Sequence, residues 1–278
     1  MVKILITAGL DGDEYAGVAA AKKLLTKKFK NVTIIPIVNK EGYKKGVSFN
    51  PLDYTFPKHV FPGKEKGSPT QRLMYRLATE YIYKCKVWID LHSGARDEKL
   101  YPFIHIGQTR NAKLRQLTNM ILQQFNNLPV RQAGETIILD KDGIWPFTKQ
   151  LDKKGILYLR FEAGEKGKIE KKWVDTLLSW VQKVTNIIGH PESFDFSQDK
   201  LRRRTFSRIL EYTSPAYYYW KPTHFRSPHL ILHQPLGTLT TNRKRITLYA
   251  KAAGQLLWWK MAGNYVRGET LLGQAVIK

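Results

Sequence analysis

Short apolar runs alternate with helical patterns over the first 190 residues, and this order constrains the fold more than any other feature. Apolar runs of strand length cover 2–7, 32–37, 87–91, 102–106, 136–139 and 156–162. Three- and four-residue apolar spacing predicts helices over 14–27, 69–84, 110–126 and 169–188. Such alternation is typical of a mainly parallel sheet covered by helices on both faces. We therefore predict an α/β fold with a mainly parallel mixed sheet.

The pattern changes after residue 190. The stretch 191–205 begins with Pro191, is polar, and includes three consecutive arginines, so we predict a connector there. From residue 206 onwards, short strand-like pieces rich in Tyr, Trp and Leu are separated by Pro and Gly. This spacing predicts a small all-β domain, barrel-like or sandwich-like, over 206–278. The expected organisation is an α/β domain over 1–190, the connector 191–205 and the β domain.

Composition narrows the class of protein. The chain has 278 residues, of which 42% are hydrophobic and 25% charged, as in soluble globular proteins. Its apolar runs are far shorter than the ~20 residues that span a bilayer, and its first residues lead directly into a strand pattern. The single cysteine, Cys85, excludes an intrachain disulfide. We therefore expect a cytoplasmic protein that does not enter the membrane.

The charge of the chain is strongly positive. Lys and Arg number 46 against 23 Asp and Glu, which gives a net charge of +23. Such an excess attracts polyanions and small acidic molecules alike. The basic residues are scattered, and the sequence lacks the signature of a specific nucleic-acid module. We interpret most of them as solvated surface and expect a small anionic substrate to benefit from the field. The pattern leaves the oligomeric state open.

Polar side chains follow two of the predicted strands. Asp11 and Glu14 come after the strand 2–7, and His92 comes after the strand 87–91. Open α/β sheets bind ligands at the carboxyl ends of their strands. Two carboxylates and one imidazole form a ligand set that zinc accepts, with a position left for water. The structural alternatives are helix capping for the two acids and a hydrogen-bonded structural role for His92.

A third strand end also carries a carboxylate. The strand 156–162 ends on Glu162, and Ala163 and Gly164 follow. A metallohydrolase needs a carboxylate outside the ligand set, which takes a proton from the metal-bound water and later gives it to the leaving amine. Glu162 suits that role. The structural alternative is a salt bridge to Arg160 or Lys166.

Five segments, in order along the chain, resemble motifs of one family. They are residues 8–17, 61–63, 67–72, 90–94 and 161–164. Together they resemble the succinylglutamate desuccinylase/aspartoacylase family, a branch of the zinc carboxypeptidase superfamily. The C-terminal β segment resembles the cap domain of that family, including a Val-x-Gly-Glu pattern at 266–269. The resemblance implies a zinc-dependent amidohydrolase in which Asp11, Glu14 and His92 hold the metal and Glu162 is catalytic.

The chain departs from the family pattern at three places. Asp11 occupies the position of the family's first ligand, a histidine, and Lys58 with His59 replaces an Asn-Arg pair that holds the substrate carboxylate. An arginine that steadies the oxyanion in relatives has no counterpart between Gly46 and Phe61. A second carboxylate ligand cancels the remaining charge of the ion, so its effect on bound water weakens. The ligand set still suits Zn²⁺, and Mn²⁺ becomes an alternative.

Basic residues near the predicted site are candidates for binding the substrate carboxylate. Lys58 offers a point charge without the fork of arginine, and His59 could assist at the rim. Arg72 and Arg96 are further candidates. The structural alternatives are a packing role for Arg72 and solvated or internally satisfied rings for His59 and His105.

Three functions fit these residues. The leading hypothesis is a metal-dependent deacylase that cleaves the amide bond of a small N-acylated amino acid. A carboxypeptidase-like peptidase would keep the metal and the fold, although a cap-like β domain would narrow its access to peptides. A degenerate, non-catalytic relative that binds an anionic ligand would explain the altered positions. The retained Glu14, His92 and Glu162 favour the deacylase.

Overall fold

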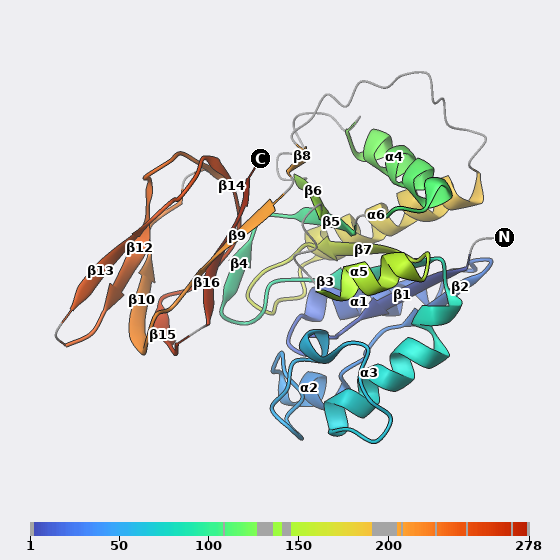
Figure 1. Ribbon diagram of the computed structural model, residues 1–278, viewed down its shortest axis with the longest axis horizontal. Helices are drawn as coiled ribbons and strands as arrows, with labels where there is room; N and C mark the ends of the chain where they lie inside the picture. The colour runs from blue at the N-terminus through green and yellow to red at the C-terminus, as the bar shows by residue number, and fades with distance from the viewer. Residues whose placement is uncertain are drawn as a thin grey trace.

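The protein is described by a computed structural model in which an α/β lobe and a lobe of antiparallel sheets lie side by side (Figure 1). The structure describes residues 3–107, 109–126, 136–140, 146–190, 205–206, 208–225, 227–242, 244–267 and 269–276. Most of the predicted connector, residues 191–204, lies outside these ranges, and the limits at 190 and 206 stay a prediction. Among the described residues, no helix combines the length and the apolar character needed to cross a membrane.

A seven-stranded sheet forms the centre of the α/β lobe, in the order β2-β1-β3-β7-β5-β6-β8. All neighbouring strands are parallel except β5 and β7, which are antiparallel. The mainly parallel mixed sheet predicted from the sequence is thus confirmed. Its strands are β1 Ile4–Ala8, β2 Val32–Ile35, β3 Val87–His92, β5 Phe103–Gly107, β6 Thr136–Asp140, β7 Leu157–Glu162 and β8 Thr205–Phe206.

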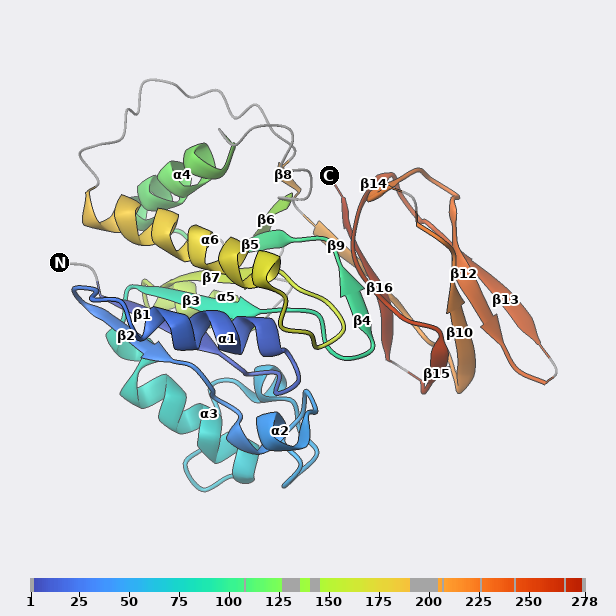
Figure 2. The ribbon, with the colours of Figure 1, turned by 180° about the vertical axis from the view of Figure 1, so that it is seen from behind.

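Helices cover both faces of this sheet (Figures 1 and 2). Helices α1 (Tyr15–Leu24), α4 (Ala112–Asn126) and α6 (Lys171–Gly189) cover one face, and α3 (Pro69–Glu80) with α5 (Pro146–Lys153) covers the other. A short α2 (Lys40–Lys45) and the 3-10 turns η1 (Pro57–Val60) and η2 (Ile82–Lys84) complete the lobe. The predicted helix 69–84 is divided between α3 and η2. The sequence did not predict α2 or α5, because six and eight residues are too few for a clear period.

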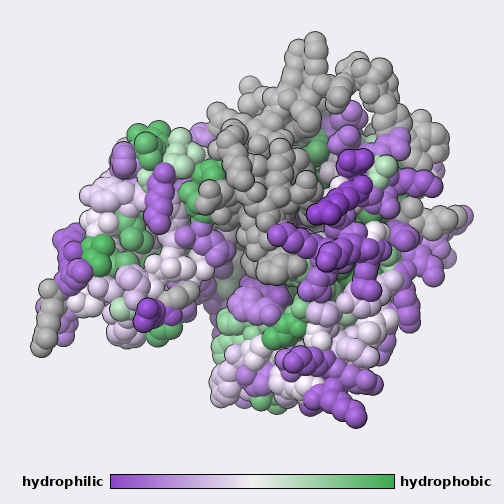
Figure 3. All heavy atoms as spheres, in the orientation of Figure 1, coloured by the Kyte–Doolittle hydropathy of each residue, from purple (hydrophilic) through white to green (hydrophobic). Residues whose placement is uncertain are grey.

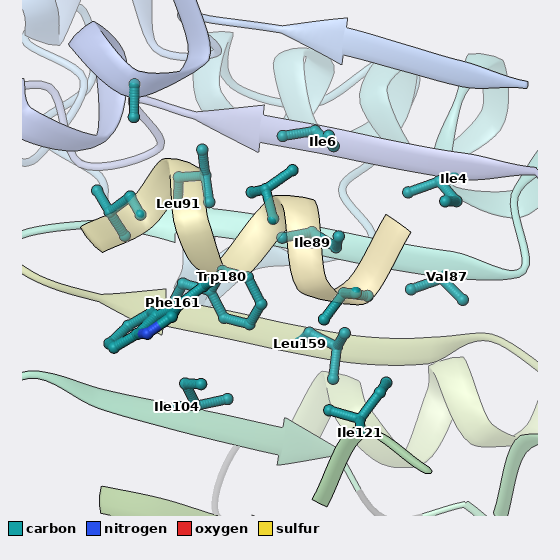
Figure 4. Close-up of a cluster of buried hydrophobic side chains, with 14 of the residues drawn as sticks. Ile4, Ile6, Val87, Ile89, Leu91, Ile104, Ile121, Leu159, Phe161 and Trp180 are labelled. Carbon is teal, nitrogen blue, oxygen red and sulfur yellow. The ribbon is translucent and has the colours of Figure 1, made fainter. Parts of the chain in front are cut away.

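Successive residues of a central strand point to opposite faces of the sheet, and the side chains on both faces are apolar. Ile89 and Leu91 of β3 point towards α6 and pack near Trp180 (Figure 4). Trp88 lies between them in sequence and packs on the opposite side, in the cluster with Met74 of α3. A strand that is buried on both faces needs apolar residues at every position. These strands therefore appear in the sequence as continuous apolar runs.

The C-terminal lobe consists of two antiparallel sheets, which confirms the predicted all-β segment. One sheet has the order β13-β12-β10-β15, and the other has β11-β14-β16-β9 with β4 paired to β14. Trp220, Leu239 and Leu256 are fully buried between them. The strands are β4 Glu98–Leu100, β9 Arg208–Thr213, β10 Tyr218–Pro222, β11 His229–Leu230, β12 Pro235–Thr240, β13 Arg245–Tyr249, β14 Gly254–Lys260, β15 Gly263–Tyr265 and β16 Thr270–Val276.

Strand β4 links the two lobes. It lies between β3 and β5 in the sequence but pairs with β14, with Leu100 opposite Trp258. The sequence did not predict this strand, because its three residues become extended only through a partner far along the chain. The pairing brings the C-terminal lobe against the carboxyl ends of β3 and β7.

Candidate metal centre

The strand register arranges polar side chains in rows across one face of the sheet. Trp88 of β3 stands beside Tyr158 of β7, and these two belong to the apolar cluster on the α3 face. Two residues further along, Asp90 stands beside Arg160, and after two more His92 stands beside Glu162. Because alternate residues of a strand share a face, the site begins where this apolar face ends.

Three predicted ligands converge at this edge. Asp11, Glu14 and His92 are buried, and each offers a ligand atom within 4.8 Å of the other two. His92 Nδ1 lies 2.8 Å from Glu14 Oε2 and 3.5 Å from Asp11 Oδ2. Asp11 Oδ1 is buried and makes no hydrogen bond among the described residues. A buried carboxylate oxygen with no donor fits a cation, so this group could bind a metal ion.

Asp90 orients the imidazole of His92. Its Oδ2 lies 2.7 Å from His92 Nε2, and it also accepts hydrogen bonds from Tyr158 and from Thr7, the latter at 2.6 Å. Trp88 Nε1 in turn donates to Thr7 Oγ1 at 2.8 Å. A neutral His92 that donates from Nε2 to Asp90 would present Nδ1 to a cation bound by Asp11 and Glu14. This carboxylate–histidine arrangement is typical of the residues that support metal ligands.

The turn between β1 and α1 positions the two carboxylates. Glu14 is the N-cap residue of α1, and its Oε2 accepts a hydrogen bond from the backbone N–H of Ser93 at 2.9 Å. Gly12 lies so close to the backbone of α2 that a Cβ atom there would be 2.2 Å from the carbonyl carbon of Gly42. Only glycine fits this contact, which holds the turn against α2 and directs Asp11 and Glu14 towards β3.

Two cations lie against the carboxylates of the site. Lys58, from the turn η1, donates to Asp11 Oδ2 at 3.0 Å. Arg160, on β7, forms an ion pair with Glu162. The salt bridge that the sequence offered as the alternative for Glu162 is therefore present. Asp11 and Glu162 thus each have a basic neighbour in the same cluster.

Burial and neighbouring charges shift the pKa values of the cluster in opposite directions. Burial and the carboxylate of Asp11 raise the pKa of Glu14 to about 8. Burial opposes the ionisation of Asp11, but Lys58 and His92 outweigh it and hold the pKa of Asp11 well below its usual value. Burial also disfavours charged His92, yet the carboxylates of Asp90 and Glu14 raise its pKa. The cluster therefore holds a proton near neutral pH that a bound cation would displace.

A cavity of about 460 Å³ opens beside the cluster, between the two lobes. Figure 3 shows the notch where the lobes meet. Glu14, Lys58 and Glu162 line it from the α/β lobe, and the C-terminal lobe supplies much of the opposite wall. The residues of that wall are Glu211, Trp258, Lys260, Arg267, Glu269 and Thr270. The cavity has room for a small molecule, with the ligand group at one end.

The structure brings some of the predicted substrate-binding residues to the cavity and not others. Lys58 and His59 line it. Arg72 is exposed on α3 and donates to the carbonyl of Gly67 at 2.6 Å, away from the cavity wall. Arg96 is exposed outside the wall and donates to the hydroxyl of Tyr15 at 3.0 Å. His105 lies buried opposite Arg160, and burial lowers its pKa to about 3.

Sequence reasoning did not assign a functional role to Asp90 or Arg160. A signal for both was present, because each is a charged residue two positions before a predicted site residue on the same strand. Side chains two apart on a strand share a face, so these charges had to lie beside His92 and Glu162. The wall from the C-terminal lobe had no comparable local signal.

Comparison with known proteins identifies the family of this chain. The model of the succinylglutamate desuccinylase/aspartoacylase catalytic domain matches residues 1–188, more than half of the chain. The chain belongs to this family. The resemblance inferred from the five sequence segments is thereby confirmed.

One relative and two solved structures show the extent of the similarity. The chain is 32% identical over 104 residues to an N-alpha-acetyl-L-2,4-diaminobutyric acid deacetylase of Halomonas elongata, a match that covers 36% of the chain and 30% of the deacetylase. A succinylglutamate desuccinylase/aspartoacylase structure from Rhodobacter sphaeroides has a TM-score of 0.77 at 18% identity, covering 100% of this chain and 86% of that one. The product-bound ectoine utilization protein EutE (DoeB) from Ruegeria pomeroyi has a TM-score of 0.75 at 17% identity, covering 99% and 85%.

Proposed function

We propose that this protein is a metal-dependent deacylase that hydrolyses the amide bond of a small N-acylated amino acid. The observation that carries the proposal is the buried group of Asp11, Glu14 and His92, which lies beside Glu162 at the wall of a cavity. Membership of the family and the deacetylase relative support the same reaction class. The enzyme would act in the cytoplasm, which suits a chain with a single cysteine.

Asp11, Glu14 and His92 are the proposed ligands of one divalent cation. Zn²⁺ is the proposed ion, and Mn²⁺ is the alternative because two of the three ligands are carboxylates. A cation bound there would supply a Lewis acid that polarises the substrate carbonyl and lowers the pKa of water. Asp90 would keep His92 in the tautomer that presents Nδ1, and Lys58 would offset part of the negative charge of the ligands.

Glu162 is the proposed general base and acid. It lies directly opposite His92 in the pairing of β3 with β7, and it lines the cavity. Its carboxylate can therefore reach a molecule bound at the ligand group. Arg160 holds this carboxylate in one orientation through their ion pair. Glu162 would accept a proton from the attacking water and give it to the leaving amine.

The basic side chains that line the cavity from the α/β lobe are the proposed site for the substrate carboxylate. Lys58, His59 and Arg160 all line the cavity on the side of the α/β lobe. An arginine offers paired donors to a carboxylate, whereas a lysine offers a point charge. Arg160 therefore takes the place in this proposal that the sequence assigned to Arg72 or Arg96, which lie away from the cavity wall.

Metal analysis and a substrate panel test the proposal together. Purified protein should contain a stoichiometric divalent ion, and Asp11→Ala should lose it. A panel of N-acyl amino acids, assayed for released amine, should include a substrate that is hydrolysed. Glu162→Gln should lower kcat by ~10²–10⁴-fold with the metal content unchanged. The matched control is Glu165→Gln, the same change three residues further on and outside the cavity wall, which should retain activity.

A non-catalytic binder of an anionic ligand is the second candidate function. The ion pair of Arg160 with Glu162 favours it, because the guanidinium occupies the carboxylate that a general base must offer to water. Calorimetry separates the two functions. Binding of an N-acyl amino acid by the metal-loaded protein without any turnover would establish the binder. Hydrolysis of peptides in preference to acyl amino acids would instead indicate a carboxypeptidase-like enzyme.

A further inference from the structure

The distribution of acidic residues in the C-terminal lobe is uneven. No Asp or Glu occurs between Glu211 and Glu269, although the chain contains 23 acidic residues. The same stretch contains the basic residues Lys221, Arg226, Arg243, Lys244, Arg245, Lys251, Lys260 and Arg267. Of these, Lys260 forms ion pairs with Asp97, just before β4, and with Glu98, the first residue of β4. The stretch therefore contributes positive charge and no carboxylate to this lobe.

One face of the sheet β13-β12-β10-β15 points away from the core of the lobe. On β10, Tyr218 and Trp220 are buried, while Tyr219 and Lys221 are exposed. On β13, Ile246 and Leu248 pack against the core, so Arg245 and Tyr249 project to the other side. We call this side the outer sheet face and define it by Tyr217, Tyr219, Lys221, Arg245 and Tyr249.

The strand register places these side chains in a row across the sheet. Asn264 of β15 pairs with Tyr219 of β10, Tyr219 pairs with Thr240 of β12, and Thr240 pairs with Arg245 of β13. Lys221 follows two residues after Tyr219 and pairs with Thr238. Tyr219 thus lies between Asn264 and Thr240 on the neighbouring strands. Lys221 is the next residue on the same face of β10, and Arg245 lies beyond Thr240 on β13.

The outer sheet face is hollowed and its aromatic rings are open to solvent. A groove of about 750 Å³ crosses it, lined by Tyr217, Tyr219, Lys221, Thr238, Thr240, Thr241, Asn242, Arg245 and Asn264. The described residues of its lining include no carboxylate. Tyr217 is 63% exposed, Tyr219 44% and Tyr249 51%. Figure 3 shows hydrophilic residues at the outer end of this lobe, over β12 and β13.

We propose that the outer sheet face binds single-stranded nucleic acid. Lys221 and Arg245 would contact the phosphates, and the bases would stack on the exposed tyrosine rings. The threonine and asparagine side chains of the groove would donate to bases or sugars. An open sheet with exposed aromatic side chains is an arrangement with which proteins bind single-stranded RNA. The groove and the catalytic cavity share no lining residue, so the two sites can be tested separately.

Fluorescence anisotropy with the full chain tests the proposal. The probe is a short fluorescein-labelled single-stranded RNA, titrated at low and at physiological salt. The double variant Lys221→Glu/Arg245→Glu should bind at least about tenfold more weakly, with a smaller salt dependence. The matched control is Lys113→Glu/Arg115→Glu on α4, which changes the net charge equally and should bind like the wild type. Both double variants should keep the deacylase activity and the thermal midpoint of the wild type.

A tyrosine variant separates nucleic acid from other polyanions. Tyr219→Ala should weaken RNA binding by about 5–100-fold, because it removes a stacking ring, and should leave the binding of heparin unchanged. Three results would overturn the proposal. They are the absence of RNA binding at low salt, an equal loss in the α4 control, and an equal affinity of Tyr219→Ala and wild type for RNA. Stronger binding to vesicles of anionic lipid than to RNA would also count against it and would indicate a membrane surface.

Discussion

Two groups of charged side chains face the same cavity, and they differ in what they contain. The metal cluster is formed by Asp11, Glu14 and His92. The junction cluster is formed by Lys260 of β14 with Asp97 and Glu98, at distances of 2.7 and 3.8 Å. Both clusters gather two carboxylates around a third group. In the junction cluster that group is a permanent cation of the chain itself, whereas in the metal cluster it is an imidazole.

This difference separates a group that could bind a metal ion from a group that is already paired within the chain. Asp11 Oδ1 is buried without a hydrogen bond among the described residues, so the metal cluster can accept one more positive group. In the junction cluster, Asp97 receives Lys260 and also lies 3.5 Å from the hydroxyl of Tyr265. A closed ion pair of this kind holds β14 against β4. We therefore expect changes in the first cluster to alter metal affinity and changes in the second to alter stability.

The largest effect in this comparison should come from Asp90→Asn. The change keeps the shape of the side chain but removes the charge that orients His92 through Nε2. Support of this kind is worth 10–100-fold in metal affinity, so the variant should bind Zn²⁺ about that much more weakly in a chelator competition. Asp97→Asn in the junction cluster is the matched control and should bind Zn²⁺ like the wild type. An equal loss of Zn²⁺ affinity in both variants would show that the two clusters do not differ in metal binding.

Lys58→Met should change metal affinity in the opposite direction. The ammonium of Lys58 lies 3.0 Å from Asp11 Oδ2 and competes with a cation for that oxygen. Its removal should tighten Zn²⁺ binding by about tenfold, the equivalent of one charge-assisted hydrogen bond, and should lower kcat/KM. Lys58→Arg should restore part of kcat/KM. Weaker Zn²⁺ binding by Lys58→Met would show that the lysine supports the ligands.

Lys260→Met should reduce stability without changing the metal site. The lysine side chain is 20% exposed and Asp97 is 45% exposed, so the pair is only partly buried. We expect a loss of about 1 kcal/mol in the free energy of unfolding, measured by urea denaturation. Zn²⁺ affinity should stay within error of the wild type. A variant that lost metal but kept its stability would reverse the assignment of the two clusters.

The smallest effect concerns the pH dependence of stability. Burial, against the attraction of Lys260, raises the pKa of Glu98 from 4.5 to about 7. The folded state therefore binds more protons than the unfolded state between these values, so this residue lowers stability as the pH rises from about 4.5 to 7. In Glu98→Gln, the thermal midpoint should fall less steeply as the pH rises from about 4.5 to 7. An unchanged slope in the variant would show that Glu98 titrates normally.

The α/β architecture and the centre of the site could be predicted because both depend on local patterns. Runs such as Val87–His92 are apolar until the strand ends, and the change to polar residues marks the edge of the sheet. His92 and Glu162 were found in this way. Short elements such as α2 and β4 could not be found, because α2 has too few residues to show a period and β4 exists only through its pairing with β14.

The amino-acid sequence alone determined the alternation of strands and helices, the polar strand ends and the identity of the three ligand candidates, because each is a property of neighbouring residues. The tertiary structure decided that Lys58 contacts Asp11 and that the C-terminal lobe forms one wall of the cavity. It also placed Arg72 away from the cavity wall. These contacts join residues far apart in the chain, and they depend on strand register and on the packing of the two lobes. A local pattern carries no information about either.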